Sequence, residues 1–470
     1  MDPILRPLES GQTKLASSSS ETTAVPGSST RRRFLASGSA AIAAFVAAKA
    51  KGQVTTGNPL QVTPPVCTTV ADTPAVERPD PQHSSHVFSA PETELAFRNH
   101  GMHAELLRQP LTPLGSHYLL IHFDIPMLDA NSYSLAIGGR VRQAFKINLD
   151  DLKSQKAFTQ TVTMECAGTG RSTLHPRPVY VPWFKEDIGT YQWTGTRLRP
   201  LLERAGLLDD AVEVLFTGWD TGVDLGVEHA FERSLPLADA LQDEVMLAWA
   251  ANGQSLLPQH GYPLRLVVPS WYGMASVKWL RAITVLNEAF QGIEQAKVYR
   301  YTQSKEDPGT PVRLKLVHSV MAPPGIPDVI TRQRFVSPGQ QVIEGKAWSG
   351  SGSVTRVQVS TDNGATWANA ELTSISSDRF AWVHWRFSWE AVAGEYVLAC
   401  RATDEAGNQQ PLDPNERFNI QGNGVNAVQR IAVTVQEGIG SAKRDVPSHA
   451  RAVLSGAKTP PTPQTINTLA

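Results

Sequence analysis

Short apolar runs recur through the central part of the chain and predict a domain with more strands than helices. Residues 199–205 fit a helix, because Pro200 suits its first turn and Gly206 suits the position after its end. The runs expected to form strands are residues 117–123, 133–137, 212–216, 245–249 and 264–268. Since strands and helices do not alternate regularly, we expect an α+β domain rather than a Rossmann sheet or a barrel.

The pattern changes near residue 323, where a series of short strands with turn signals begins. Strands are expected at residues 341–347, 355–360, 382–387 and 396–401. Asn363-Gly364 follows one of these runs and is a strong hairpin signal. The aromatic residues expected to fill a core are Trp348, Trp367, Trp382, Trp385 and Trp389. The second domain is therefore predicted to be an immunoglobulin-like β-sandwich.

Composition and charge exclude several classes of function. A chain of 470 residues is long enough for two to four domains. Lys and Arg number 43 against 44 for Asp and Glu, so the chain has no overall positive field and nucleic acid is not an expected partner. The three cysteines, Cys67, Cys166 and Cys400, allow at most one disulfide and exclude a metal site built from cysteines alone.

The first fifty residues resemble an export signal. Arg31-Arg32 and Phe34-Leu35 precede a weakly apolar run of about fourteen residues, which is shorter than the ~20 residues of a membrane-spanning helix. This pattern resembles a bacterial twin-arginine signal, although a chance basic cluster before an Ala-rich helix is the alternative. We expect a signal peptide over 1–50, a linker over 51–94, a disordered tail over 437–470 and a periplasmic or other extracytoplasmic location, with no membrane span.

Cys166 is the centre of the candidate chemistry. It follows a strand-like run and begins the small-residue stretch Cys166-Ala167-Gly168, after which Arg171 supplies a positive charge. Small residues allow a bulky group to approach the backbone, and a nearby arginine favours a thiolate, which is a metal ligand or a nucleophile. Taken alone, the motif leaves two possibilities, a reactive cysteine and a buried structural one.

Several separated motifs resemble the sulfite oxidase family of molybdenum enzymes, in the order in which that family has them. The resemblance covers residues from about 95 to 435 and includes a C-terminal run at 345–367 similar to the family's dimerisation domain. The motifs in the first domain are residues 97–100 (Phe-Arg-Asn-His), 166–171 (Cys-Ala-Gly-Thr-Gly-Arg), 259–269 and 276–280 (Ser-Val-Lys-Trp-Leu). The resemblance to this family implies a mixed α/β molybdopterin-binding domain over 95–318 and an immunoglobulin-like dimerisation domain over 319–436.

The resemblance also implies roles for individual residues. Cys166 would be the protein ligand of molybdenum held by a pterin, and Arg98 and Arg171 would bind a sulfur oxyanion above the metal. Tyr299 would donate a hydrogen bond at the reacting centre, with Tyr301 as the alternative, and Trp183 would form a wall of the pocket. The residues expected to hold the molybdopterin are Arg98, Asn99, His100, Asp220, His260, Arg265, Ser276, Val277 and Lys278.

Two departures from the family pattern concern positive charge. Gly170 stands where the family has the first of two arginines, and Gln421 stands before a glycine where sulfite oxidases have an arginine at the substrate site. One substrate-binding charge is therefore missing, which weakens the expectation that sulfite is the substrate. His103 is a further candidate donor near the entrance.

The expected function is an exported, homodimeric molybdenum enzyme that oxidises sulfite to sulfate. No haem-attachment motif Cys-x-x-Cys-His is present, so we expect no haem in this chain and a separate electron acceptor such as a cytochrome c. Alternatives in the same class are a sulfane dehydrogenase subunit and a reductase of an oxidised sulfur or nitrogen compound. A noncatalytic secreted binding protein is the alternative from another class.

Overall fold

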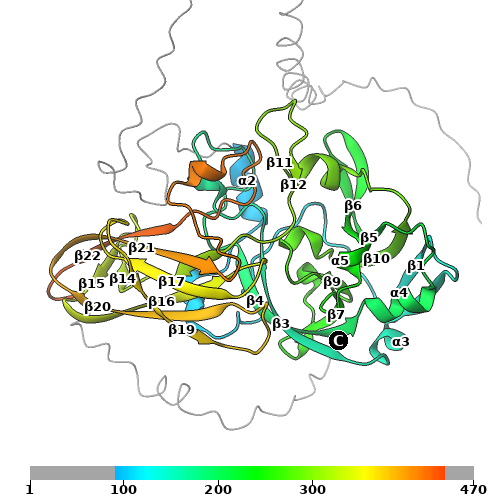
Figure 1. The fold of residues 1–470 in the computed structure, drawn as a ribbon, viewed down its shortest axis with the longest axis horizontal. Coiled ribbons are helices and arrows are strands. Elements are labelled where there is room, and N and C mark those ends of the chain that lie inside the picture. Colours follow the sequence, from blue (N-terminus) through cyan, green and yellow to red (C-terminus); the bar gives the residue numbers. More distant parts are fainter. Residues whose placement is uncertain (1–89, 440–470) are drawn as a thin grey trace, which may run out of the picture. The chain divides into compact units, whose positions relative to one another are not determined.

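The computed structural model describes residues 90–439. The expected signal, most of the expected linker and nearly all of the expected tail lie outside the described residues. Within residues 90–439, no helix is long and apolar enough to cross a membrane. The described part consists of mixed α and β structure followed by a β-sandwich, which confirms the expected fold class, with strands outweighing helices (Figure 1).

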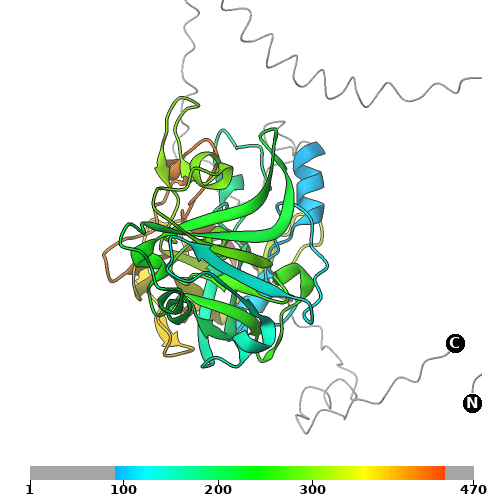
Figure 2. The same cartoon turned by 90° about the vertical axis from the view of Figure 1, so that its right-hand side faces the viewer.

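The first domain contains two sheets. Strands β1 and β10 are parallel neighbours, and the other pairs in their sheet are antiparallel. The strands of this sheet, from one edge to the other, are β2 (Phe145–Asn148), β1 (Ser134–Gly139), β10 (Leu280–Leu286), β5 (Glu213–Asp224) and β6 (Val227–Pro236). Strands β5 and β6 form a long hairpin, visible as a green pair in Figure 2.

The second sheet carries the segments that surround Cys166. Its strands are β3 (Phe158–Glu165), β4 (Ile188–Arg197), β7 (Met246–Ala251) and β8 (Gln254–Ser255), with β9 (Arg265–Val267) also paired to β7. A separate pair is formed by β11 (Arg300–Tyr301) and β12 (Thr310–Pro311). Strand β3 ends at the residue before Cys166, so the sheet determines where the cysteine lies.

The helices are short and lie beside the sheets. They are α2 (Ala90–Arg98), α3 (Leu149–Lys153), α4 (Arg199–Ala205) and α5 (Leu237–Ala240). Helix α4 confirms the prediction for residues 199–205, with Pro200 in its first turn and Gly206 at φ +70° after its last residue. Glycine adopts this left-handed conformation without the steric cost of a Cβ, which explains why the helix ends there.

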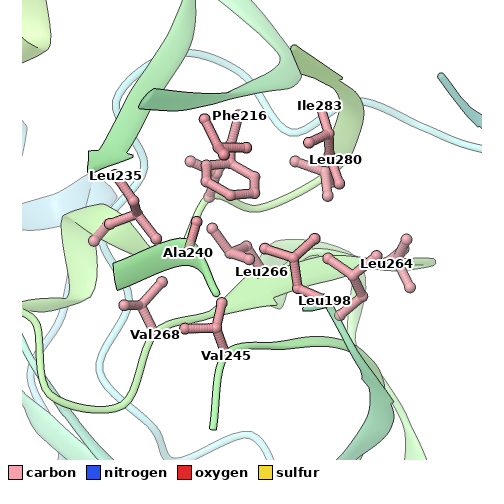
Figure 3. Close-up of a cluster of buried hydrophobic side chains, with 14 of the residues drawn as sticks. Leu198, Phe216, Leu235, Ala240, Val245, Leu264, Leu266, Val268, Leu280 and Ile283 are labelled. Atoms are coloured by element: carbon pink, nitrogen blue, oxygen red, sulfur yellow. The ribbon is translucent and has the colours of Figure 1, made fainter. Parts of the chain in front are cut away.

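The main apolar core lies between the two sheets. Its side chains come from every layer, including Phe216 of β5, Ile283 of β10, Leu266 of β9 and Leu198 before α4, and all four are fully buried. Figure 3 shows Phe216 and Ile283 on one side of the cluster, with Leu266 between them and Val245. Full burial of one such side chain contributes about 1.5–3 kcal/mol, so this core fixes the relative position of the sheets that carry the site.

The C-terminal domain is a sandwich of a four-stranded and a six-stranded sheet. The first contains β13 (His318–Met321), β16 (Gly339–Trp348), β20 (Val383–Ala391) and β19 (Glu371–Ser374). The second contains β14 (Ile326–Pro327), β15 (Arg334–Val336), β22 (Gln429–Val435), β21 (Gly394–Asp404), β17 (Val354–Ser360) and β18 (Ala368–Asn369). All four strands predicted here exist, each with longer bounds than expected.

The tryptophans of the sandwich do not all fill its core. Trp385 and Trp389 pack inside it, whereas Trp367 is half-buried and lies under the guanidinium of Arg401. Trp348 and Trp382 belong to a different cluster, shared with residues of the first domain such as Ile188. The prediction that all five fill the sandwich was therefore wrong, because burial against the first domain satisfies two of them equally well.

The strand predicted at residues 117–123 was also wrong. This segment is extended, but its only ladder contact is a single bridge between His100 and Leu119. Apolar alternation alone does not distinguish a strand from an extended segment without a partner. The side chains of this segment instead line the cavity at Cys166.

Candidate functional site

Cys166 lies at the start of a tight loop and is nearly fully buried. Its backbone N–H donates to the carbonyl oxygen of Asp187 at 2.9 Å, and the N–H of Gly168 donates to its Sγ at 3.4 Å. Burial raises the pKa of the Cys166 thiol to about 12, and the carboxyl of Asp187 adds to this, while Arg171 acts in the opposite direction. The thiol is therefore protonated in the free protein, and a bound metal ion would deprotonate it.

A cavity opens at Cys166. Its free volume is about 50 Å³. The lining residues are His117, Tyr118, Leu119, Leu120, His122, Met164, Cys166, Ala167, Asp220, Phe231, His260, Arg265, Gly273, Met274, Ser276, Lys278 and Tyr299. They come from widely separated stretches of the chain between residues 117 and 299, which the fold brings together.

One wall of this cavity is cationic. Arg265 donates to the carbonyl oxygens of His260 and Ser276, both at 3.0 Å, and its guanidinium lies over the ring of Trp193. Lys278 donates to two backbone carbonyl oxygens, and burial together with Arg265 lowers the pKa of its amine to about 7. Among the described residues, neither Arg265 nor Lys278 donates a hydrogen bond to a carboxylate. An anion bound here would therefore stabilise both charges.

Three buried polar atoms at the cavity lack hydrogen-bond partners among the described residues, Nε2 of His117, Nε2 of His260 and Oδ1 of Asp220. Burial lowers the pKa of His260 to about 2 and raises that of Asp220 to about 6. Buried polar atoms without partners are rare in proteins, and such atoms at a cavity indicate a missing ligand. The site therefore fits a cofactor that combines negative charge with several hydrogen-bonding groups and a metal that prefers thiolate.

Ser276 and Val277 form hydrogen bonds that support the cationic wall of the cavity. The hydroxyl oxygen of Ser276 accepts a hydrogen bond from the N–H of Val268 at 3.0 Å, which leaves its own proton available for a ligand. Val277 is buried and its carbonyl oxygen accepts from the N–H of Leu266 at 2.8 Å. Residues 276 and 277 thus form hydrogen bonds with the segment that contains β9, the strand that carries Arg265.

Tyr299 reaches the cavity from the other side and meets His122. Its hydroxyl lies 2.7 Å from Nε2 of His122, whose ring stacks on Phe231 at a centroid distance of 4.3 Å. Burial lowers the pKa of His122 to about 3 and raises the pKa of Tyr299 well above its usual value. The guanidinium of Arg233 lies 5.2 Å from the centre of the Tyr299 ring. Tyr301, the alternative, does not line the cavity.

Arg171 is buried beside Cys166. A Cβ at Gly168 would lie 2.6 Å from a guanidinium nitrogen of Arg171, so only glycine permits this approach. The guanidinium donates to the carbonyl oxygens of Gln421 and Val181 and to Oδ1 of Asn423. The positive charge therefore lies near the cysteine, although Arg171 is not among the residues that line the cavity, and each of these three acceptors is neutral.

The two departures from the family pattern have structural counterparts. Gly170 has φ +83°, and a Cβ there would collide with the carbonyl oxygen of Val425, so an arginine does not fit this backbone. The side chain of Gln421 donates to the carbonyl oxygen of Lys297 at 2.7 Å, while its own backbone oxygen holds Arg171.

The residues at 97–100 are not among those that line this small cavity. Arg98 is exposed and pairs with Asp124 at 2.8 Å, and His100 is also exposed. Asn99 is buried, and its side-chain oxygen accepts from the N–H of Ile121 at 2.7 Å, so it braces the segment that carries His122. His100 lies close enough to His260 to help lower the pKa of that cavity histidine, so the role of these three residues in holding the cofactor and substrate stays a prediction.

Trp183 packs against the residues around Cys166 in the same apolar cluster, but it does not line the cavity at the cysteine. It lines a different and larger cavity of about 560 Å³, together with His103 and Asp187. This second cavity contains no cysteine, so volume alone would point to the wrong place. The expected role of Trp183 as a wall of the substrate pocket is not seen.

The sequence pattern did not identify His117, Tyr118 and His122 as residues of the site. All three lie in the segment interpreted as a plain strand, and burial lowers the pKa of His117 to about 3. Two histidines within an apolar run were the available signal, because histidine inside a core is costly unless it has a partner or a function.

Comparisons with known proteins agree with this site. Residues 122–294 match the family model described as the oxidoreductase molybdopterin binding domain, and residues 314–436 match the Mo-co oxidoreductase dimerisation domain. The first match begins after residues 97–100 and includes His122. It covers Cys166, His260, Arg265 and Lys278, and a molybdopterin-binding domain implies the molybdenum cofactor.

Individual relatives give the same assignment. The mitochondrial sulfite oxidase of Mus musculus is 34% identical over 341 residues, which are 69% of this chain and 62% of the mouse protein. The sulfite oxidase of Gallus gallus is 33% identical over 338 residues, covering 68% of this chain and 72% of the chicken protein. The crystal structure of the sulfane dehydrogenase SoxCD from Paracoccus pantotrophus matches with a TM-score of 0.62 and 28% identity, covering 71% of this chain and 84% of that chain.

The aligned region thus spans less than two thirds of the mouse protein's length but more than two thirds of the chicken protein's. Together with the two matched domains and the buried cysteine in a cavity with one cationic wall, this is inconsistent with a noncatalytic binding protein. The chain belongs to the sulfite oxidase family of molybdopterin-dependent oxidoreductases.

Proposed function

We propose that the protein oxidises sulfite to sulfate and passes the electrons singly to a separate acceptor such as a c-type cytochrome. In this reaction sulfite gains the oxygen atom of one water molecule and loses two electrons, and that water molecule releases two protons. The molybdenum cofactor supplies the two-electron redox chemistry when bound, with Cys166 as its protein ligand. The remaining tasks are to bind a small dianion and to move protons.

The observation that carries this proposal is the buried guanidinium of Arg171 beside Cys166. Burial lowers the pKa of Arg171, but its intrinsic value is so high that it remains charged at neutral pH. None of the three groups that accept its hydrogen bonds is acidic, and a buried charge of this kind is stabilised when an anion binds next to it. A planar guanidinium also presents paired donors that suit the oxygens of a sulfur oxyanion.

Tyr299 and His122 are suited to handle a proton. His122 is neutral at pH 7 because burial lowers its pKa to about 3, so its Nε2 can accept the phenol proton. When Nε2 of His122 carries no proton, it accepts the hydrogen bond of the phenol, and the Tyr299 oxygen can accept a hydrogen bond from a ligand. When Nε2 carries the proton, it donates to the Tyr299 oxygen, and the phenol can donate its hydrogen to a ligand. The pair can therefore serve the substrate before and after it loses electrons, without adding a charge to the pocket.

A second candidate is the oxidation of sulfur bound to a protein, the activity named for SoxCD. Two observations favour it, the neutral Gln421 at the expected arginine position and the similarity to the solved SoxCD structure. A substrate with fewer negative charges needs fewer cations. A sulfite oxidase reaction instead requires that Arg171 and the remaining cations suffice for a dianion.

Kinetics with purified, molybdenum-containing protein separate the two. Sulfite-driven reduction of cytochrome c or ferricyanide supports the first proposal, while reduction driven only by a carrier protein with a cysteine-bound persulfide supports the second. Metal analysis of the same sample must show molybdenum, because protein without it gives no information about the substrate.

The location and the assembly are also proposals. The twin-arginine pattern at residues 31–35 supports export of folded, cofactor-loaded protein across the cytoplasmic membrane. The match of residues 314–436 to a dimerisation domain supports a homodimer through the C-terminal domain. Light scattering on the purified protein tests the dimer, and cell fractionation tests the location.

A further inference from the structure

A chain of three buried polar side chains joins the residue before Cys166 to the C-terminal domain. Glu165 ends β3, His318 begins β13 of the sandwich, and Lys185 lies in the segment between Arg171 and β4. All three are at most 2% exposed. We call Glu165, His318 and Lys185 the interdomain triad.

The contacts of the triad fix its hydrogen-bond directions. Nδ1 of His318 lies 2.8 Å from Oε1 of Glu165, and Nε2 of His318 lies 3.5 Å from Nζ of Lys185. An ammonium group can only donate and a carboxylate can only accept, so Nε2 of the imidazole accepts from Lys185 and Nδ1 donates to Glu165. Lys185 also donates to the carbonyl oxygen of Ala427 at 2.9 Å.

The second oxygen of Glu165 is bound to the sandwich as well. Its Oε2 accepts from Nε1 of Trp348 at 2.7 Å, so both carboxyl oxygens are bound by residues of the C-terminal domain. On the other side of the cysteine, the N–H of Gly424 donates to the carbonyl oxygen of Ala167 at 2.7 Å. The residues immediately before and after Cys166 are thus both held by the C-terminal domain.

We propose that the C-terminal domain positions Cys166 through this triad, with His318 as the positioning residue that aligns the cysteine with the metal. The inference rests on the proposed role of Cys166 as the molybdenum ligand, not on the identity of the substrate. Buried charges require matching partners, so the triad has one arrangement and holds the end of β3 in one place. A module matched only to dimerisation would then also determine the geometry of the metal–sulfur bond.

The sandwich contains a chemically similar set that provides a matched control. Nε2 of His384 lies 3.4 Å from Glu344, and its Nδ1 lies 3.2 Å from Nζ of Lys346. His384 and Glu344 are partly exposed, and neither contacts the first domain's residues around Cys166 in the hydrogen bonds or ion pairs of the described chain. Replacing His384 therefore tests the loss of a Lys-His-Glu set without a change next to the cysteine.

The experiment compares His318→Phe, His318→Gln and His384→Phe in the full-length, molybdenum-containing protein. The readouts are molybdenum content, the visible absorption band of the metal-bound thiolate, kcat and KM. We expect His318→Phe to shift the band and to lower kcat roughly 10- to 100-fold, with KM within about twofold, as residues that orient metal ligands do. Gln can donate to Glu165 and accept from Lys185, so His318→Gln should restore most of both values.

Unchanged band and kcat in His318→Phe would overturn the proposal, and so would an equal effect in His384→Phe. A kcat that falls only in proportion to molybdenum content would also overturn it, because that indicates lost folding or loading. If His318→Phe does not fold, Trp348→Phe decides, since it removes one hydrogen bond to Glu165 and keeps an aromatic ring. The band requires no substrate, so its shift tests the triad even if the protein does not oxidise sulfite.

Discussion

The phenol oxygen of Tyr299 lies 2.7 Å from Nε2 of His122, although 177 positions of sequence separate the two residues. His122 precedes the first strand of the molybdopterin-binding domain, and Tyr299 follows its last long strand, β10. Their meeting closes the cavity at Cys166 and gives it a neutral proton acceptor beside a phenol. This pairing leads to the first of five predictions.

Replacing Tyr299 with Phe should lower kcat more than it raises KM. The substitution removes one hydrogen-bond donor and leaves the charges in the pocket unchanged, so the loss should appear mainly in the reaction step, by about tenfold or more. Steady-state kinetics with sulfite measure this. Tyr301→Phe is the matched control, since Tyr301 lies outside the cavity, and an equal effect in both variants would refute the assignment.

Cys166→Ser should abolish sulfite oxidation. Serine replaces a soft thiolate by a hydroxyl that is poorly ionised, so the molybdenum loses its protein ligand while Arg265 and Lys278 still bind the pterin. Activity per molecule and molybdenum content are the measurements. Cys400→Ala serves as the control, because Cys400 is buried in the sandwich. Ordinary activity in Cys166→Ser would exclude the molybdenum assignment.

Arg171→Gln should raise KM for sulfite by roughly tenfold to a hundredfold, because a charge-assisted hydrogen bond contributes about 1.5–3 kcal/mol. Arg98→Gln should leave KM within about twofold, since Arg98 is exposed and pairs with Asp124. The two variants differ only in which arginine is neutralised. A KM that changes in Arg98→Gln and not in Arg171→Gln would mean that the substrate binds near Arg98 and not near Arg171.

Three cavity histidines predict a loss of stability in acid. Burial lowers the pKa of His117 and His122 to about 3 and that of His260 to about 2, whereas an unfolded histidine titrates near 6.5. Between pH 6.5 and about 3 the unfolded state therefore binds more protons, so stability falls as the pH falls. Each histidine contributes up to about 1.4 kcal/mol per pH unit in that window.

Chemical unfolding at several pH values between 4 and 7 measures this slope. His117→Phe keeps a ring in the same packing and removes one titrating group, so its slope should be shallower by up to about 1.4 kcal/mol per pH unit. Identical slopes for the parent and the variant would show that His117 is protonated in the folded protein.

The last prediction concerns export. Changing Arg31, Arg32 and Arg33 together to lysine should leave cofactor-loaded protein in the cytoplasm, because a twin-arginine signal is read by its arginines and not by charge alone. Immunoblots of fractionated cells report the distribution. Changing Lys49 and Lys51 to arginine is a control that keeps the pattern at 31–35. Normal release of the triple variant would indicate another signal.

Local features of the sequence were sufficient for several elements and for the cysteine. Helix α4 could be predicted because the proline in its first turn and the glycine after its last residue both lie within eight consecutive residues. The order of a mixed domain and a sandwich followed from strand spacing and turn residues. Cys166, Arg171 and the residues from His260 to Lys278 could be selected because small residues, charges and a thiol stand there in a specific order.

Only the tertiary structure decided which histidines line the cavity at Cys166. Residues 97–100 match the family motif, and in the structure Arg98 ends helix α2 and pairs with Asp124, while the side-chain oxygen of Asn99 accepts a hydrogen bond from the N–H of Ile121. The cavity is instead lined by His117 and His122. The sequence by itself determined the chemistry of the cysteine loop, because that chemistry is local. The packing of two sheets and a sandwich decided its surroundings, because contacts such as Tyr299 to His122 and Glu165 to His318 join residues with no pattern linking them along the chain.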